Sequence, residues 1–154
     1  MYWAEGNQDG FIGQSLTDGS DPLRLISGQS SPRGIVIDFE EWRLYWTCVG
    51  GGLIRSSSMD GGDMRTIQLA QNSAPQGIAV WGDRIYWSNH FAFKLESIAK
   101  DGRDNQTLTT GLFHLYHLAI VSGLTPPVNR TNHCASQSCS GVCVLTDVSF
   151  RCLS

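Results

Sequence analysis

The sequence predicts an all-β fold made of similar four-stranded units, because one set of motifs recurs at a nearly constant spacing. Tyr-Trp pairs are found 43 and then 41 residues apart, at Tyr2-Trp3, Tyr45-Trp46 and Tyr86-Trp87. An Asp-Gly pair follows each of them, at Asp18-Gly19, Asp60-Gly61 and Asp101-Gly102. Pro-x-Gly-Ile precedes the second and third pairs, with its glycines at Gly34 and Gly77. Three motifs that recur in one order indicate an internal repeat.

Each repeat is expected to contain four short strands. Residues 35–38 and 78–81 are largely β-branched runs that follow a glycine, which is typical of strands buried on both faces. The Tyr-Trp strands come next, over 43–47 and 84–88, and are followed by third strands over 53–58 and 93–99. Asp-Gly then joins the third strand to the fourth, and we expect a type I′ turn there, with positive φ at both central residues.

A four-stranded antiparallel unit of just over 40 residues has the size of one β-propeller blade. Counting along the chain gives the last three strands of one blade, two complete blades, and a final inner strand over 116–121. Each blade of a propeller buries its faces against two neighbours. We therefore expect a partial propeller, whose open blade faces favour self-association.

Four of the five cysteines lie within the last 21 residues, at Cys134, Cys139, Cys143 and Cys152. This density is typical of a small disulfide-bonded module from an oxidising compartment. The gaps between these cysteines do not match the usual spacing of zinc ligands. Asn105 and Asn129 begin Asn-x-Thr triplets, which accept N-linked glycans if the chain is secreted.

Tyr-Trp-Ala-Glu, Tyr-Trp-Thr-Cys and Tyr-Trp-Ser-Asn resemble the Tyr-Trp-Thr-Asp (YWTD) repeat of the low-density-lipoprotein-receptor family. The resemblance implies part of a six-bladed YWTD propeller over 1–121, a linker over 122–131 and an incomplete EGF-like module over 132–154. In place of the family's aspartate, the fourth motif position holds Glu5, Cys48 and Asn89.

The resemblance also implies disulfides Cys134–Cys143 and Cys139–Cys152, with Cys48 left without a partner. An EGF-like module has six cysteines, and this segment has four. The acidic and amide residues of calcium-binding modules are absent just before Cys134, so we expect no calcium there.

Several other functions are disfavoured by the sequence. A net charge of −3 with scattered basic residues offers no stripe for nucleic acid. The longest apolar run, near 118–121, is too short to cross a bilayer, and residues 1–5 do not resemble a secretory signal. Residues 50–52 and 56–60 form no phosphate loop or nucleophile elbow. We expect no enzyme, metal or cofactor, and a membrane connection only through other parts of a parent protein.

The family resemblance implies an extracellular, ligand-binding segment of an endocytic lipoprotein-receptor-type receptor, with a lipoprotein or another secreted protein as ligand. The loops after the Tyr-Trp strands should share one end of the propeller, where Trp81, His90 and Phe91 are candidates for a ligand-binding patch. The alternative for Trp81 and Phe91 is packing between blades. His90 is the best placed of four histidines for acid-triggered ligand release, the others being His114, His117 and His133. Each of them could also titrate without consequence.

Three alternative functions remain open. Two are binding proteins: a Wnt co-receptor, and a basement-membrane propeller of the nidogen type. The third is a six-bladed propeller hydrolase of the gluconolactonase type, against which the YWTD-like repeat and the clustered cysteines argue.

Overall fold

A computed structural model of the protein describes residues 1–7 and 9–120, together with the backbone of 142–145 and 150–153. Its contacts divide the chain into two compact units. The larger, which we call the blade unit, contains Tyr2–Gln14 and Arg24–Ile120. The smaller contains Met1, Ser15–Leu23 and Val121–Ser154. Each unit is described by itself.

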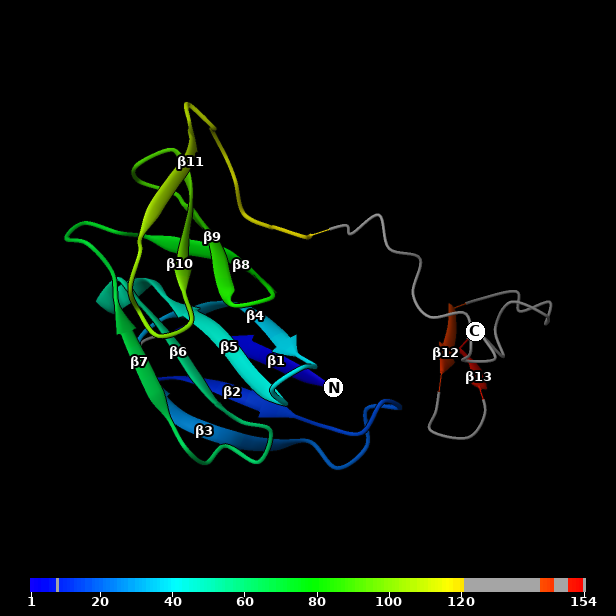
Figure 1. Ribbon diagram of the computed structural model, residues 1–154. Helices are drawn as coiled ribbons and strands as arrows, with labels where there is room; N and C mark the ends of the chain where they lie inside the picture. Colours follow the sequence, from blue (N-terminus) through cyan, green and yellow to red (C-terminus); the bar gives the residue numbers. More distant parts are fainter. Residues whose placement is uncertain (8, 121–141, 146–149, 154) are drawn as a thin grey trace. The chain divides into compact units, whose positions relative to one another are not determined.

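Three antiparallel sheets, the first, second and third blades, form the predicted repeat (Figure 1). The first blade has the order β1-β2-β3 (Tyr2–Glu5, Gly10–Gln14, Leu23–Gln29). The second has the order β4-β5-β6-β7 (Pro32–Asp38, Arg43–Cys48, Leu53–Ser58, Arg65–Gln68). The third has the order β8-β9-β10-β11 (Pro75–Trp81, Arg84–Asn89, Lys94–Ala99, Gln106–Thr110). These sheets confirm the predicted strand order, with one three-stranded and two four-stranded blades.

The sequence predicted a final inner strand over 116–121. The structure has no strand at residues 115–120, and Val121 lies outside the described residues. Inner strands β4 and β8 are each hydrogen-bonded to the Tyr-Trp strand that follows, β5 and β9 respectively. No Tyr-Trp strand follows residues 115–120 in the described part of the chain. The segment therefore has no such partner for its backbone groups.

The prediction of type I′ turns at Asp-Gly is wrong. In the second blade, Gly61 has φ of 85°, but Asp60 does not have positive φ. The amide of Gly61 donates to the Ser58 carbonyl, and the Ser58 amide donates to the Gly62 carbonyl. This is the pattern of a three-residue loop in which only the last position needs positive φ. The Asp60 carboxylate accepts a hydrogen bond from the Gly62 amide, which explains the aspartate.

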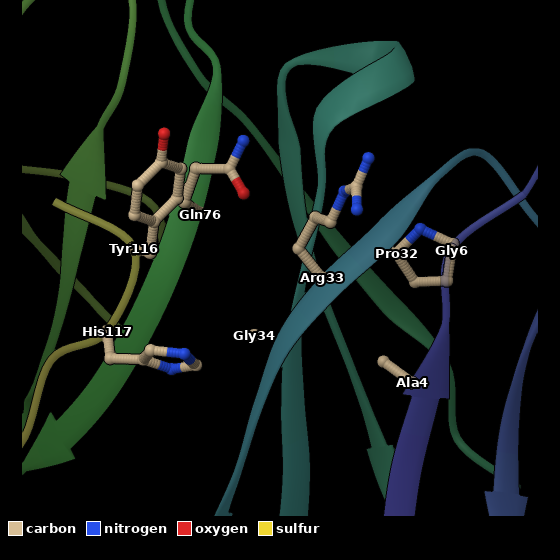
Figure 2. A pocket seen from close by; sticks show the side chains of 8 residues that line it. All are labelled: Ala4, Gly6, Pro32, Arg33, Gly34, Gln76, Tyr116 and His117. Atoms are coloured by element: carbon tan, nitrogen blue, oxygen red, sulfur yellow. The ribbon is translucent and has the colours of Figure 1, made fainter. Parts of the chain in front are cut away.

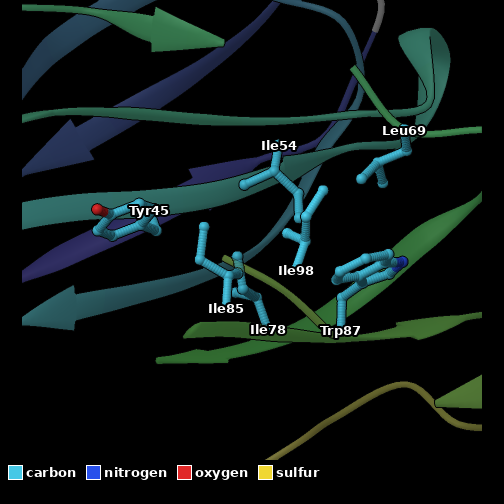
Figure 3. Packing of buried hydrophobic residues seen from close by; sticks show 7 residues of the cluster. All are labelled: Tyr45, Ile54, Leu69, Ile78, Ile85, Trp87 and Ile98. Atoms are coloured by element: carbon cyan, nitrogen blue, oxygen red, sulfur yellow. The ribbon is translucent and has the colours of Figure 1, made fainter. Parts of the chain in front are cut away.

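Two apolar clusters lie between the blades. One is made by the first and second blades and contains Ile12, Ile26, Leu44, Trp46 and Cys48. The other is made by the second and third blades and contains Tyr45, Ile54, Leu69, Ile78, Ile85, Trp87 and Ile98 (Figure 3). The motif tryptophans Trp46 and Trp87 are fully buried, so the repeat is a packing motif.

The glycines of Pro-x-Gly-Ile lie where the inner strand of each blade is approached most closely, Gly34 by β8 and Gly77 by residues 117–118. A Cβ atom on Gly34 would lie 2.4 Å from the carbonyl oxygen of Gln76 in β8. A Cβ atom on Gly77 would lie 2.9 Å from backbone atoms of His117. Real Cβ atoms do not come this close to backbone. Glycine is therefore required at these positions by packing, and neither residue has positive φ.

An ion pair joins the second and third blades. The Lys100 ammonium, after β10, donates to the carboxylates of Asp38, at the end of β4, and of Glu41, in the β4–β5 connection. The side chains of Lys100 and Asp38 are 12% and 5% exposed. Burial tends to raise the Asp38 pKa, but hydrogen bonds from Lys100 and from the Glu40 and Glu41 amides outweigh it and lower that pKa.

The second unit contains two local features that can be described. The Met1 amino group donates to the Ser15 carbonyl, and Gly19, at φ of 83°, closes a turn with Leu16. Strands β12 (Val142–Leu145) and β13 (Phe150–Leu153) pair antiparallel, with Cys143 opposite Cys152. The predicted disulfides stay predictions, because Cys134 and Cys139 lie outside the described residues.

Replacing Lys100 by Met should lower the free energy of unfolding by about 3 kcal/mol at pH 7, because Asp38 would stay buried without its cation. The lowered pKa of Asp38 means that the stabilisation is present above the unfolded value of about 3.9 and is lost as pH falls through the folded value. Urea unfolding at pH 7 and pH 3 measures both effects. The double variant Lys100→Met, Asp38→Asn should recover part of the loss. An equal effect of Lys100→Met at both pH values would contradict this account.

Candidate functional site

The three residues predicted to form a ligand patch do not lie together. Trp81 ends β8 and is paired with Arg84. Pro75, at the other end of β8, is paired with Asn89, which immediately precedes His90 and Phe91. Trp81 therefore lies at the end of the blade that carries the Asp-Gly turn, whereas His90 and Phe91 lie at the opposite end. Trp81 and Phe91 are both exposed, and neither belongs to the apolar clusters between the described blades.

Asn89 holds the loop that contains His90 and Phe91. Its side-chain oxygen accepts hydrogen bonds from the amides of Ala74 and Ala92, at 3.1 and 3.4 Å. Its side-chain nitrogen donates to a Glu96 carboxylate oxygen at 2.8 Å. Asn89 and Glu96 are both buried. The amide group is needed here because one side chain must accept from backbone and donate to a carboxylate.

An aromatic patch lies next to this loop. Ring centroids of His90 and Tyr116 are 5.4 Å apart, those of His90 and Phe91 are 5.9 Å apart, and those of Phe93 and Phe113 are 4.8 Å apart. His114 is 6.5 Å from Tyr116. Phe91 and Phe113 are 69% and 68% exposed. We call His90, Phe91, Phe93, Phe113, His114 and Tyr116 the aromatic patch.

A cavity of about 380 Å³ lies between β1, the beginnings of β4 and β8, and residues 116–117 (Figure 2). Its lining residues are Ala4, Gly6, Pro32, Arg33, Gly34, Gln76, Tyr116 and His117. In Figure 2 the Tyr116 hydroxyl points upward, the Gln76 amide points to the side on which Arg33 lies, and His117 points towards Gly34. Tyr116 belongs to both the cavity and the aromatic patch, so the two form one continuous surface.

The chemistry of this surface suits binding. No carboxylate lines the cavity, and the described residues contain no cluster of His, Cys, Asp or Glu that could hold a metal ion. Arg33 is exposed and makes no hydrogen bond or ion pair within the described part of the chain. Exposed aromatic rings beside a free guanidinium are the side chains that carry most binding energy at protein interfaces.

The remaining predicted site residues are structural or untested. Tyr45, Trp46 and Trp87 lie in the inter-blade packing. Tyr86 is half-buried, and Tyr2-Trp3 is in β1, which is only partly covered. Cys48 is a buried free thiol whose pKa is raised by burial. Asn105 is exposed, as a glycan acceptor must be, whereas Asn129 and His133 lie outside the described residues.

Sequence reasoning missed most of the aromatic patch. Phe93 was assigned to a strand, and Phe113 and His114 lie between predicted elements in a segment without alternation. A second repeated feature, an arginine–aspartate contact, was also missed. Arg43 and Arg84, which begin the Tyr-Trp strands, donate to the carboxylate and carbonyl of Asp63 and Asp104. The signal was the aspartate that recurs two residues after each Asp-Gly pair.

Several receptors are among the known proteins similar to this chain. It is 28% identical to vitellogenin receptor Yl of Drosophila melanogaster over 153 residues, which is 96% of this chain and 7% of that receptor. It is 28% identical to low-density lipoprotein receptor-related protein 5 of Mus musculus over 131 residues, which is 80% of this chain and 8% of that protein. No family model matches.

Among solved structures, one chain of the nidogen/laminin complex is similar to this chain, with a TM-score of 0.64 and 25% identity. The match covers 71% of this chain and 43% of that one. The relatives belong to the low-density-lipoprotein-receptor family, and the fold of this chain is that of a YWTD-type propeller segment. The YWTD segment spans less than a tenth of the receptors above. Staphylococcus aureus virginiamycin B lyase, at 17% identity and a TM-score of 0.60, shares the fold alone. Within the described residues, no helix is long and apolar enough to span a membrane.

Replacing Asn89 by Asp, the family's residue, should destabilise this YWTD segment by about 2–3 kcal/mol at pH 7. The new carboxylate would face that of Glu96 in a buried site and lose the donated hydrogen bond. Adding Glu96→Gln should restore most of the loss, because the Gln amide can donate to Asp. Urea unfolding of the single and double variants measures the coupling. An Asn89→Asp variant as stable as the wild type, and unaffected by Glu96→Gln, would contradict this account.

Proposed function

We propose that this chain is a non-catalytic, extracellular binding segment of an endocytic cell-surface receptor, and that it binds a secreted protein through the aromatic patch. The observation that carries the proposal is the exposure of Phe91, on a loop fixed by the buried Asn89, and of Phe113, whose ring packs against Phe93. Large rings held rigidly in place lose little entropy on binding, which is why such residues serve as interface anchors.

The receptors among the relatives support an extracellular, cell-surface setting and a protein ligand. One relative, named a vitellogenin receptor, matches 96% of this chain. A lipoprotein of the vitellogenin type is therefore the first ligand to test. The endocytic role is proposed from the resemblance of the Tyr-Trp repeat to the low-density-lipoprotein-receptor family.

A second candidate function is matrix binding. The solved nidogen/laminin complex is similar to this chain at 25% identity, so laminin is a reasonable second ligand. A Wnt co-receptor role would follow from the likeness to receptor-related protein 5, but no contact in the blade unit favours it over the others. For a hydrolase, the cavity lacks the carboxylates that would hold a catalytic metal.

The patch can be tested with purified vitellogenin and laminin as probes. Replacing Phe91 and Phe113 together by Ala should weaken binding of the true ligand at least about 30-fold, because each anchor contributes about 1–2 kcal/mol. Phe39→Ala is the matched control, since Phe39 is equally exposed but lies in the β4–β5 connection at the opposite end. Biolayer interferometry gives the Kd values. Equal losses for the two sets, or no binding of either probe, would contradict the proposal.

Secretion can be tested separately. Protein expressed through a secretory pathway should carry a glycan at the exposed Asn105 and at Asn129. Peptide mapping should then find Cys134–Cys143 and Cys139–Cys152, with Cys48 free. A disulfide from Cys48 to any of the four, or an unchanged mass after enzymatic deglycosylation, would argue against this assignment.

A further inference from the structure

Two tryptophans are exposed at the end of the blade unit that carries the Asp-Gly turns, opposite the aromatic patch. Trp42 ends the β4–β5 connection and is 63% exposed. Trp81 ends β8, just before the β8–β9 connection at residues 82–83, and is 49% exposed. Neither ring belongs to the apolar clusters between the described blades. The packing of the blades therefore does not account for them.

The backbone at Trp42 has a conformation that favours glycine. Its φ of 54° lies in the left-handed region, which bulky residues rarely adopt. The Trp42 ring packs edge to face against Phe39, with centroids 6.1 Å apart, and still remains mostly exposed. The sequence thus places an exposed tryptophan where glycine would relax the turn. Such strain points to a role in binding, since folding gains little from it.

Lys100 holds the two connections side by side. Its ammonium donates to Asp38 and Glu41 of the second blade, and its amide donates to the Asp83 carbonyl of the third blade at 2.9 Å. Asp38 also accepts a hydrogen bond from the Glu40 amide at 3.0 Å, which fixes the β4–β5 turn. Both blades at this junction have four strands. The two tryptophans are therefore displayed on a rigid, fully formed part of the fold.

The free charges beside these rings are negative. Glu40 and Asp83 are exposed, and within the described part of the chain their carboxylates have no hydrogen bond or ion pair. The basic residues at this end of the second and third blades are already paired: Arg43 and Arg65 with Asp63, Arg84 with Asp104, Lys100 with Asp38 and Glu41, and Arg103 with Asp101. A partner that brings cations here meets two carboxylates that are not yet neutralised.

We propose that Trp42, Trp81, Glu40 and Asp83 form a second protein-binding surface, whose occupant is a basic segment of a partner protein in which arginine or lysine alternates with apolar residues. A guanidinium or ammonium group can stack on a tryptophan face and pair with the neighbouring carboxylate. The apolar side chains between the cations would cover the remaining ring surface. Because the turn is already rigid, little conformational entropy is lost on binding. This surface is separate from the aromatic patch and is independent of the ligand proposed for that patch.

The test uses a fluorescent peptide of alternating arginine and leucine, titrated into the full chain and followed by anisotropy. We expect saturable binding, and no binding of a peptide with glutamate in place of arginine. Trp42→Ala combined with Trp81→Ala should weaken binding at least about tenfold, because two stacking faces are lost. Glu40→Gln combined with Asp83→Asn should weaken it about fivefold and reduce its dependence on salt.

The matched control for charge is Glu5→Gln combined with Asp9→Asn. It removes the same charge from the β1–β2 loop, which lies at the opposite end, beside Pro32. Its Kd for the arginine peptide should equal that of the wild type. Trp42→Gly tests the anchor without strain, because glycine removes the ring and relaxes the turn together. This variant should bind the peptide more weakly than the wild type, yet melt at a higher temperature than Trp42→Ala.

Any of four outcomes would overturn the proposal. The first is absence of saturable binding by the arginine peptide, and the second is an equal loss in the two charge variants. The third is wild-type affinity in Trp42→Gly. The fourth is self-association of the chain, measured by sedimentation, that is lost in the double variant of Trp42 and Trp81. That last result would assign the surface to a second copy of this chain.

Discussion

The close approach of neighbouring inner strands is the constraint on which the blade unit depends. It is possible only because Gly34 and Gly77 have no side chain. Hydroxyl groups fix the same region: Thr47 accepts from the Gly34 amide and donates to the Gln76 carbonyl across the blade boundary, and Ser88 accepts from the Gly77 amide. With the inner strands held in this way, the buried tryptophans are placed between the sheets and the loops after the Tyr-Trp strands meet at one end.

The two complete blades share this plan but differ at the fourth motif residue, and the difference decides what each loop can do. Cys48 is buried beside Trp46, whose indole donates to Gln29 from the first blade. Asn89 instead binds two backbone amides and Glu96. Only the second arrangement supports an exposed aromatic loop, so the patch belongs to the third blade.

The periodic parts of this fold could be predicted from the sequence, and the rest could not. Tyr-Trp, Asp-Gly and Pro-x-Gly-Ile identified the blades because each has a repeated packing or turn requirement. The turn type was wrong because Asp-Gly fits two hairpin geometries, and only the hydrogen bonds at Ser58 separate them. Trp81 lies at the opposite end of the third blade from His90 and Phe91 because of the direction and register of β8 and β9. Tyr116 packs against His90, and Phe113 packs against Phe93. These contacts join residues far apart in the sequence, so no local sequence pattern predicts them.

The most direct test of the central constraint is to place a methyl group between the inner strands. Gly34→Ala and Gly77→Ala should each lower the free energy of unfolding by about 2–3 kcal/mol, because backbone must move to admit the Cβ atom. Gly62→Ala is the control, since its Cβ atom would meet only side-chain atoms of Ser58 and Asp60, at 3.2 Å or more. It should lose less than about 1 kcal/mol. Urea unfolding that shows the same small loss for all three variants would contradict the account.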